Sequence, residues 1–504
     1  MRINRNVIVN LARQRESLPR DASRQASLRD VSGTTLVLVG LVCMCALALA
    51  SGIVLLTLAV ALPLLVQMLG SRAARVPFGV IDVPTIVLFT YILFFPLGYL
   101  RLVLYPGSAT FARGVYPTEV LDICLRFGAW FTIGMLVGAW IAVLRAGGYK
   151  GGTRNVPEAS VAHIGWCAVI LSILSVGGLA LVVADFGSVN TAMEAYAPHD
   201  RTVGVAAASG RGSSAWAVFA VPAVAASSIY FFTATGSARH YTRLLSGVVV
   251  VAILGAAVVI FSSRLVLILG LISVLGCRYW VRRQRATPFE VVGLLGFVVT
   301  VSILLLRLRP GYAEEPFLLR VMKILDYAVL NVSAGLQVRT PYVHIEIFNL
   351  ERAWTIIRSL LPVGRPSAED LSEARLDVVV AQTIGSSAQG ATSGLPPSMP
   401  TALMMMAGPV FGVVLAFLLG FAGSMLTQAL LRRDSVVAGL FFGLSLSFIF
   451  NAYKGGDVIL DLVGEIRRFG YVGLIVLGVI LMARILGPYG PALGRGKGDS
   501  NVLE

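Results

Sequence analysis

Residues 33–70 read GTTLVLVGLVCMCALALASGIVLLTLAVALPLLVQMLG and run for 38 positions without a charged residue. A single helix of that length would be about 57 Å long, at about 1.5 Å per residue. The hydrocarbon core of a bilayer is only about 30 Å thick. We therefore expect two membrane-spanning helices here, joined by a tight turn near Ser51 and Gly52.

The composition extends this pattern to the whole chain of 504 residues. Hydrophobic residues make up 57% and charged residues 13%, whereas soluble domains contain about 25% charged residues. The mean hydropathy is +0.82. These values exclude a soluble enzyme, a disordered protein and a nucleic-acid-binding module. We assign the net charge of +15 to short basic loops between membrane spans rather than to nucleic-acid binding.

Other apolar stretches supply the remaining spans. The length argument also splits 244–280 in two, around Ser262, Ser263 and Arg264. The expected spans are two within 33–70, two within 244–280, and one in each of 80–100, 124–144, 161–183, 214–234, 288–306, 402–430, 435–452 and 469–486. The sequence thus predicts an all-α polytopic membrane protein with about twelve transmembrane helices.

The distribution of basic residues predicts the orientation. If the N-terminus is cytoplasmic, the short inner segments hold 16 Lys and Arg residues and the short outer loops hold 9, as the positive-inside rule requires. The expected organisation is a basic cytoplasmic tail (1–32), nine spans (33–306), a large outer loop (307–400), three spans (401–486) and a cytoplasmic C-terminal tail (487–504).

The loop 307–400 is too long to lack structure of its own, and its pattern predicts amphipathic helices on the membrane surface. One face of the clearest helix is apolar and comprises Leu350, Ala353, Trp354, Ile357, Leu360 and Leu361. Arg352, Thr355 and Ser359 lie on the opposite face. Ser367, followed by Glu369 and Asp370, predicts a second helix start.

Arg264 lies at the outer tip between two spans. An arginine at the centre of a bilayer costs at least about 2.5–3.5 kcal/mol, so we expect it at the interface or in a wet cavity. There it contacts lipid headgroups or clamps an anion, because guanidinium matches phosphate oxygens. Each basic residue of the predicted outer face, taken alone, is a charge that faces solvent or lipid headgroups. Together these residues could bind the diphosphate of a lipid carrier. The further candidates are Arg201, Arg211, Arg339, Arg352, Arg358, Arg365 and Lys454.

Three residues are candidates for acid–base chemistry. His344 and Glu346 face the same side of an extended segment and can supply a general base; the alternative for His344 is an interface histidine. Asp457 ends the turn Lys454-Gly455-Gly456-Asp457, whose alternative is a plain charged turn. The chain has no H-E-x-x-H, no G-x-x-x-x-G-K-[ST] and no G-x-S-x-G motif. With no aspartate cluster typical of magnesium sites, we expect neither a metal nor a cofactor.

At three places the chain resembles the bacterial oligosaccharide repeat unit polymerases, the Wzy-type O-antigen and exopolysaccharide polymerases. The first is Ser262-Ser263-Arg264-Leu265, similar to the family's small-small-Arg turn. The second is Leu361-Pro362, followed by 392–400 and by Gly408-Pro409-Val410-Phe411-Gly412, similar to the late outer loop and glycine-rich helix. The third is Lys454-Gly455-Gly456-Asp457, similar to a basic-Gly-acidic turn. The ten residues between Arg201 and Gly212 match a spacing of some members.

The resemblance implies a GT-C-like membrane glycosyltransferase in the bacterial inner membrane. An acceptor hydroxyl would attack the anomeric carbon of an undecaprenyl-diphosphate-linked oligosaccharide at the periplasmic face, and undecaprenyl diphosphate would leave. The implied partners are lipid-linked oligosaccharides, membrane lipids and a chain-length regulator. Arginines would neutralise the leaving group in place of a metal, so the implied enzyme is metal-independent.

Two alternatives stay open. An O-antigen ligase would transfer the same donor to lipid A core, but His344 is followed by Ile345 rather than by the small polar residue expected of ligases. A twelve-helix lipid-glycan flippase or transporter fits the span count. Against it stand the position of the long loop, the lack of two-half symmetry and the scarcity of charge within the predicted spans.

Overall fold

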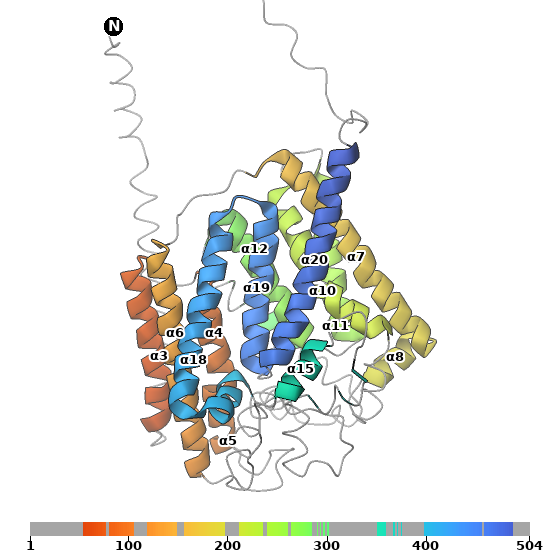
Figure 1. The fold of residues 1–504 in the computed structure, drawn as a ribbon. Coiled ribbons are helices and arrows are strands. Elements are labelled where there is room, and N and C mark those ends of the chain that lie inside the picture. The colour runs from red at the N-terminus through yellow and green to blue at the C-terminus, as the bar shows by residue number, and fades with distance from the viewer. Residues whose placement is uncertain are drawn as a thin grey trace, which may run out of the picture.

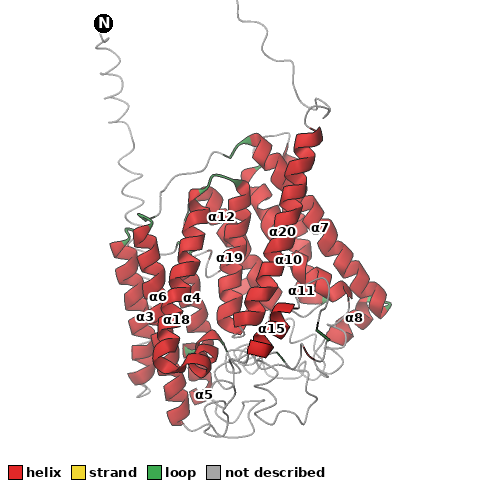
Figure 2. Ribbon diagram, viewed as in Figure 1, coloured by secondary structure: helices red, strands yellow, loops and turns green. Residues whose placement is uncertain are grey.

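The computed structural model describes ten segments of the chain, together with single positions within 290–301 and 366–374. The segments are 54–76, 80–104, 118–148, 156–196, 211–234, 239–260, 264–284, 350–358, 398–455 and 458–486. Every regular element in these segments is a helix and none is a strand (Figure 2). The expected all-α class is therefore confirmed for the part of the chain described.

The helices are α3 (Val54–Ala73), α4 (Val83–Phe94), α5 (Pro96–Leu104), α6 (Thr118–Arg145), α7 (Glu158–Phe186), α8 (Val189–Tyr196), α10 (Arg211–Thr233), α11 (His240–Val259), α12 (Arg264–Arg282), α15 (Leu350–Arg358), α18 (Met399–Arg432), α19 (Val436–Gly455) and α20 (Val458–Leu486). Most of them stand side by side as a bundle (Figure 1).

Nine of the described spans are long and apolar enough to cross a membrane, and α10 contains a shorter apolar stretch, Val218–Thr233. These ten match expected spans one for one. The other two expected spans, the first within 33–70 and that at 288–306, lie wholly or largely outside the described residues. The chain is thus a multi-pass membrane protein, and the total of twelve spans stays a prediction.

Local sequence explains several helix boundaries. Asp82 caps α4, because its Oδ1 accepts the backbone N–H of Thr85 at 3.0 Å. Gly187 ends α7 in a left-handed conformation with φ of 76°. Within α18, Gly408 has φ of 75° and the next residue, Pro409, lacks a backbone N–H. The α18 helix is therefore two helical segments that meet at this Gly-Pro pair.

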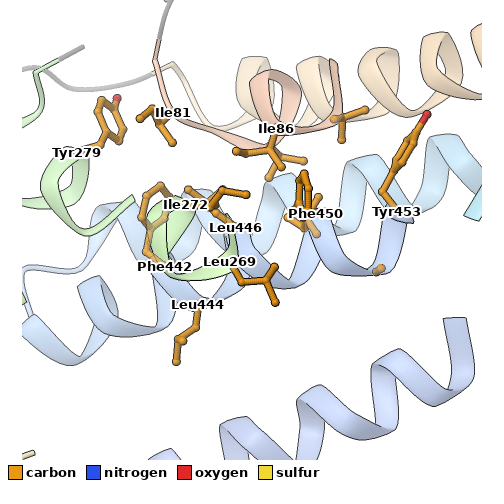
Figure 3. Packing of buried hydrophobic residues seen from close by; sticks show 14 of the residues in the cluster. Ile81, Ile86, Leu269, Ile272, Tyr279, Phe442, Leu444, Leu446, Phe450 and Tyr453 are labelled. Carbon is orange, nitrogen blue, oxygen red and sulfur yellow. The ribbon is translucent and has the colours of Figure 1, made fainter. Parts of the chain in front are cut away.

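Helix α19 lies at the centre of the bundle, since 78% of its apolar stretch is buried, compared with 17% for α20 and 22% for α11. It packs against α4, α12 and α18. Figure 3 shows Ile86 of α4, Ile272 of α12, and Phe442 and Phe450 of α19 in one apolar cluster. A helix that is apolar on all sides is buried, whereas the less buried helices present apolar faces to lipid.

Helices α6 and α18 approach each other unusually closely. A Cβ atom at Gly138 would overlap the carbonyl oxygen of Phe417, and one at Gly420 would overlap the carbonyl oxygen of Met135. Small residues allow such backbone contact between membrane helices. The glycines on the two helices therefore set the distance between α6 and α18.

The two ends of the bundle differ in charge. The upper end in Figure 1, where α6, α18 and α20 finish, is here called the arginine-rich end. Its basic residues are Arg72, Arg75, Arg145, Arg239, Arg243, Arg278, Arg282, Arg283, Arg432, Arg433 and Arg484. Asp434 and Glu290, which pairs with Arg278, also lie at this end. The opposite, mixed-charge end holds Asp122, Arg126, Asp185, Glu351, Arg352, Arg358, Lys454, Asp461, Glu465, Arg467 and Arg468. The orientation of these two ends in the membrane stays a prediction.

Candidate functional site

The strongest concentration of buried charge lies at the mixed-charge end, where α19 meets α20. Helix α19 ends at Gly455 and α20 begins at Val458, so only two residues connect them. Lys454, in the last turn of α19, is only 6% exposed. A lysine is almost never fully buried without a polar partner, so this position is a candidate for a function beyond packing.

Asp461 lies in the first turn of α20 and reaches back to α19. Its Oδ1 accepts a hydrogen bond from Nδ2 of Asn451 at 3.4 Å. A Cβ atom at Gly455 would overlap its Oδ2, so the carboxylate rests directly on the glycine backbone. The glycine of the Lys454-Gly455 pair is therefore required by close contact with an acidic side chain.

A buried ion pair follows one turn further along α20. Arg468 Nη1 donates to Glu465 Oε1, and the two side chains are 18% and 4% exposed. Among the described residues, Glu465 Oε2 and Arg468 Nε have no hydrogen-bond partner. The pair therefore leaves one acceptor and one donor unsatisfied inside the protein.

Helix α15 covers the outside of this region. Ile356 of α15, Ala374 and Val463 of α20 form a small buried cluster, and Arg352 Nε donates to the carbonyl oxygen of Ala374. Helix α15 therefore packs against the same stretch of α20 that carries the ion pair. The loop 307–400 thus contributes at least one helix to the site.

The face of α15 that packs against the protein lies apart from the apolar face predicted from the sequence. Ile356 is fully buried, whereas Trp354 is 57% exposed and Ile357 41% exposed. The apolar face predicted from the sequence therefore points away from α20. Tryptophan is enriched at membrane interfaces, so this outward face suits the predicted position at the membrane surface.

The second helix start predicted in the loop is confirmed at the described positions. The backbone N–H of Asp370 donates to Oγ of Ser367, and the backbone N–H of Ser367 donates to Oδ2 of Asp370, both at 3.0 Å. This is a reciprocal cap. The hydrogen bonds from Ser367 lower the pKa of the Asp370 carboxyl.

The last turn of α19 is fixed by its aromatic neighbours. Tyr453 is fully buried, and its hydroxyl lies 2.7 Å from that of Thr132 on α6. Its ring makes edge contacts with Phe95 and Phe131. The backbone position of Lys454 is therefore fixed by the preceding residue, Tyr453, whose side chain is held in the protein interior.

The structure places only part of the predicted site. Lys454 lies at the α19–α20 junction, and Arg352 and Arg358 belong to α15, which packs against α20. Arg211 and Arg264 begin α10 and α12, at the mixed-charge end of the bundle; their side chains are not among the described ones. The predicted residues outside the described segments are Arg201, Arg339, His344, Glu346, Arg365 and Asp457.

Sequence reasoning missed Asp461, Glu465 and Arg468 as site residues. The last span was expected at 469–486, which left these residues in a loop, but α20 already begins at Val458. A usable signal existed, because positions 461, 465 and 468 follow helical spacing and share one face.

Among the residues that the structure describes, no group of three or more His, Cys, Asp or Glu side chains is arranged to hold a metal ion. The polar groups available at the α19–α20 junction are an ammonium, an amide, two carboxylates and guanidinium groups. These can bind an anion and accept a proton.

Comparison with known proteins assigns no family to this chain. No protein-family model matches it, and no curated protein or solved structure matches it. The resemblance to the repeat unit polymerases therefore rests on the predicted topology and on short motifs.

Proposed function

We propose that the protein is a membrane glycosyltransferase that polymerises undecaprenyl-diphosphate-linked oligosaccharide repeat units at the periplasmic face of the bacterial inner membrane. The observation that carries the proposal is the charged cluster of Lys454, Asp461, Glu465 and Arg468 at the α19–α20 junction, in which Lys454 and Glu465 are buried. Ionisable residues inside membrane helices are costly and mark functional sites by default.

The position of the cluster suits a substrate that is half lipid and half glycan. Helix α20 has 29 residues and is about 43 Å long, which exceeds the about 30 Å of the hydrocarbon core. Its charged first turns therefore lie near the bilayer boundary. A polyprenol in the bilayer places its diphosphate at this same depth.

The chemistry of the cluster suits the proposed reaction. An acceptor hydroxyl forms a bond to the anomeric carbon of the donor, the bond from that carbon to the diphosphate oxygen breaks, and the hydroxyl proton passes to a base. Lys454 and Arg468 can stabilise the negative charge that develops on the leaving diphosphate. The free oxygen of Glu465 can accept the proton. His344, Glu346 and Asp457 stay candidates for the same role.

The wider proposal follows from this placement. The arginine-rich end would face the cytoplasm, together with both chain termini, and the mixed-charge end would face the periplasm. A chain-length regulator would contact the protein from the periplasmic side. Magnesium would not be required, because cations of the chain would carry the charge of the leaving group.

The test is reconstitution of the full-length protein in liposomes with a defined lipid-linked repeat unit. We expect a ladder of extended products that persists in EDTA. Glu465→Gln should lower the rate at least about 100-fold, in line with the loss of a general base, whereas Arg72→Gln at the other end should not. A folded wild-type protein that extends no substrate would contradict the proposal.

A lipid-glycan transporter is the second candidate, because charged residues that the sequence assigned to a loop lie within a membrane-spanning helix of the structure. Few charges lie within the spans predicted from the sequence, yet Asp461, Glu465 and Arg468 lie in the continuous helix α20. Intramembrane charges also mark transport pathways. The same liposomes distinguish the two: a transporter moves a labelled lipid-linked glycan across the bilayer and leaves its length unchanged.

A further inference from the structure

A second polar site lies at the arginine-rich end, away from the α19–α20 junction. A cavity of about 350 Å³ opens between α7, the start of α19 and the last turns of α20. Its size is near the lower limit of ligand pockets, about 300–1,000 Å³. Nothing in the proposed polymerisation uses this cavity, so it is open to another role.

The polar groups of the cavity come from three helix ends. Ser160 and His163 lie one turn apart on α7, Ser435 immediately precedes α19, and Arg484 lies in the last turn of α20. Among the described residues that line the cavity none is acidic. Asp434, which immediately precedes Ser435, is exposed and is not part of the lining. A guanidinium, an imidazole and two hydroxyls together suit a phosphate group.

The start of α19 adds to this preference for an anion. The backbone N–H groups of Ala438 and Gly439 donate to the carbonyl oxygen of Ser435. Val436 and Val437, which also line the cavity, are the first two residues of α19 and come before the first residue that makes one of these bonds. The first amides of a helix and its dipole favour negative charge.

The rest of the lining is apolar and continues onto the lipid-facing surface. Ile164, Val476 and Ile480 form the cavity wall. Beside them, Trp166 of α7 is 63% exposed and Leu477 of α20 is 52% exposed. An apolar wall gives a free phosphate ion no binding energy, but it matches the acyl chains of a phospholipid.

The depth of the cavity also fits a lipid. The membrane span of α7 begins at Ser160 and that of α20 ends at Ile485, so the cavity lies where the hydrocarbon core meets the headgroup layer. We propose that this cavity binds an anionic phospholipid, with the phosphate on Arg484 and His163 and the acyl chains along α7 and α20. The site stands independently of the polymerase proposal.

Native mass spectrometry of the delipidated full-length protein tests the site with phosphatidylglycerol and phosphatidylcholine vesicles as lipid sources. We expect phosphatidylglycerol to be retained preferentially. Arg484→Gln should weaken its apparent affinity about tenfold, because it removes one hydrogen bond to a charged group. Arg72→Gln removes the same charge at the same end, outside the cavity, and should change the affinity less than twofold.

A second variant covers the case in which Arg484→Gln fails to fold. Ala483→Phe places a ring in the cavity without changing any charge and should displace the lipid. Equal retention by Arg484→Gln and Arg72→Gln, or equal retention of the two lipids, would overturn the proposal. Inorganic phosphate that competes fully with phosphatidylglycerol for the same site would identify a soluble anion as the ligand and would also overturn it.

Discussion

At the scale of single residues, the Glu465–Arg468 pair is the most informative contact, because it is buried and only partly satisfied. Breaking a fully buried ion pair costs about 3–5 kcal/mol. Arg468 keeps 18% exposure, so we expect Glu465→Met or Arg468→Met alone to cost somewhat less, about 2–3 kcal/mol. Thermal unfolding in detergent measures the loss.

The double variant separates a pair from two independent charges. Glu465→Met with Arg468→Met leaves no unpaired charge, so its unfolding free energy should lie well above the value expected from the sum of the single losses. Arg72→Met serves as the exposed control. Strict additivity of the two single effects would show that the side chains do not form the ion pair.

Asp370 gives a prediction on pH. Hydrogen bonds from Ser367 lower the pKa of its carboxyl in the folded chain from the ordinary value of 3.8. A group with a lowered folded pKa stabilises the fold above its unfolded pKa, and that contribution is lost as the pH falls through the folded pKa. We compare the rate of hydrogen exchange at the Ser367 amide between the wild-type protein and Asp370→Asn. The two rates should be equal at the lowest pH, and above pH 4 the rate should be slower in the wild-type protein. Equal exchange at every pH would rule out the cap.

At the scale of elements, the glycines between α6 and α18 make a prediction. Gly420→Val places a side chain against the backbone of Met135 and should lower the unfolding free energy by about 1–3 kcal/mol, the cost of overpacking. Gly478→Ala in α20 is the matched control, because no atom lies near its Cβ position. The control should be neutral or stabilising by about 0.5–1 kcal/mol.

The elements also show how far the sequence predicts this fold. The span expected at 435–452 is α19, Val436–Gly455, because a charge-free stretch of the right length identifies a buried helix. The span expected at 469–486 begins eleven residues earlier, at Val458. Hydropathy assigns charged residues to a loop, and it contains no information on neighbours such as Asn451 and Gly455 of α19, which contact Asp461.

The sequence predicted part of the candidate site, as it predicted part of the fold. Lys454 stood out because of its Gly-Gly turn, and the capping pattern at Ser367 located a helix start. The packed face of α15 was not predictable, because it depends on the contact between Ile356 and Val463 of α20, which lie more than 100 residues apart in the sequence. Periodicity identifies the faces of a helix, but tertiary contacts decide which face is buried.

At the scale of the whole molecule, the two ends of the bundle predict opposite accessibility. Ser188, between α7 and α8, is exposed at the mixed-charge end, and Asp434, between α18 and α19, is exposed at the arginine-rich end. In a background without the native cysteines, a membrane-impermeant maleimide should label Ser188→Cys in intact spheroplasts. It should label Asp434→Cys only after the membrane is permeabilised.

This orientation is a physical condition for the proposed polymerisation site, and it decides in which leaflet the proposed lipid site lies. Lipid-linked glycans reach the α19–α20 junction from the periplasm only if Ser188→Cys is labelled from outside, and the cavity at Arg484 then lies in the cytoplasmic leaflet. With the reverse pattern, the buried charges of α20 would face the cytoplasm, where the proposed polymerisation does not occur. The anionic-lipid site would survive that result, because Arg484 and His163 need only a headgroup layer, whichever leaflet provides it.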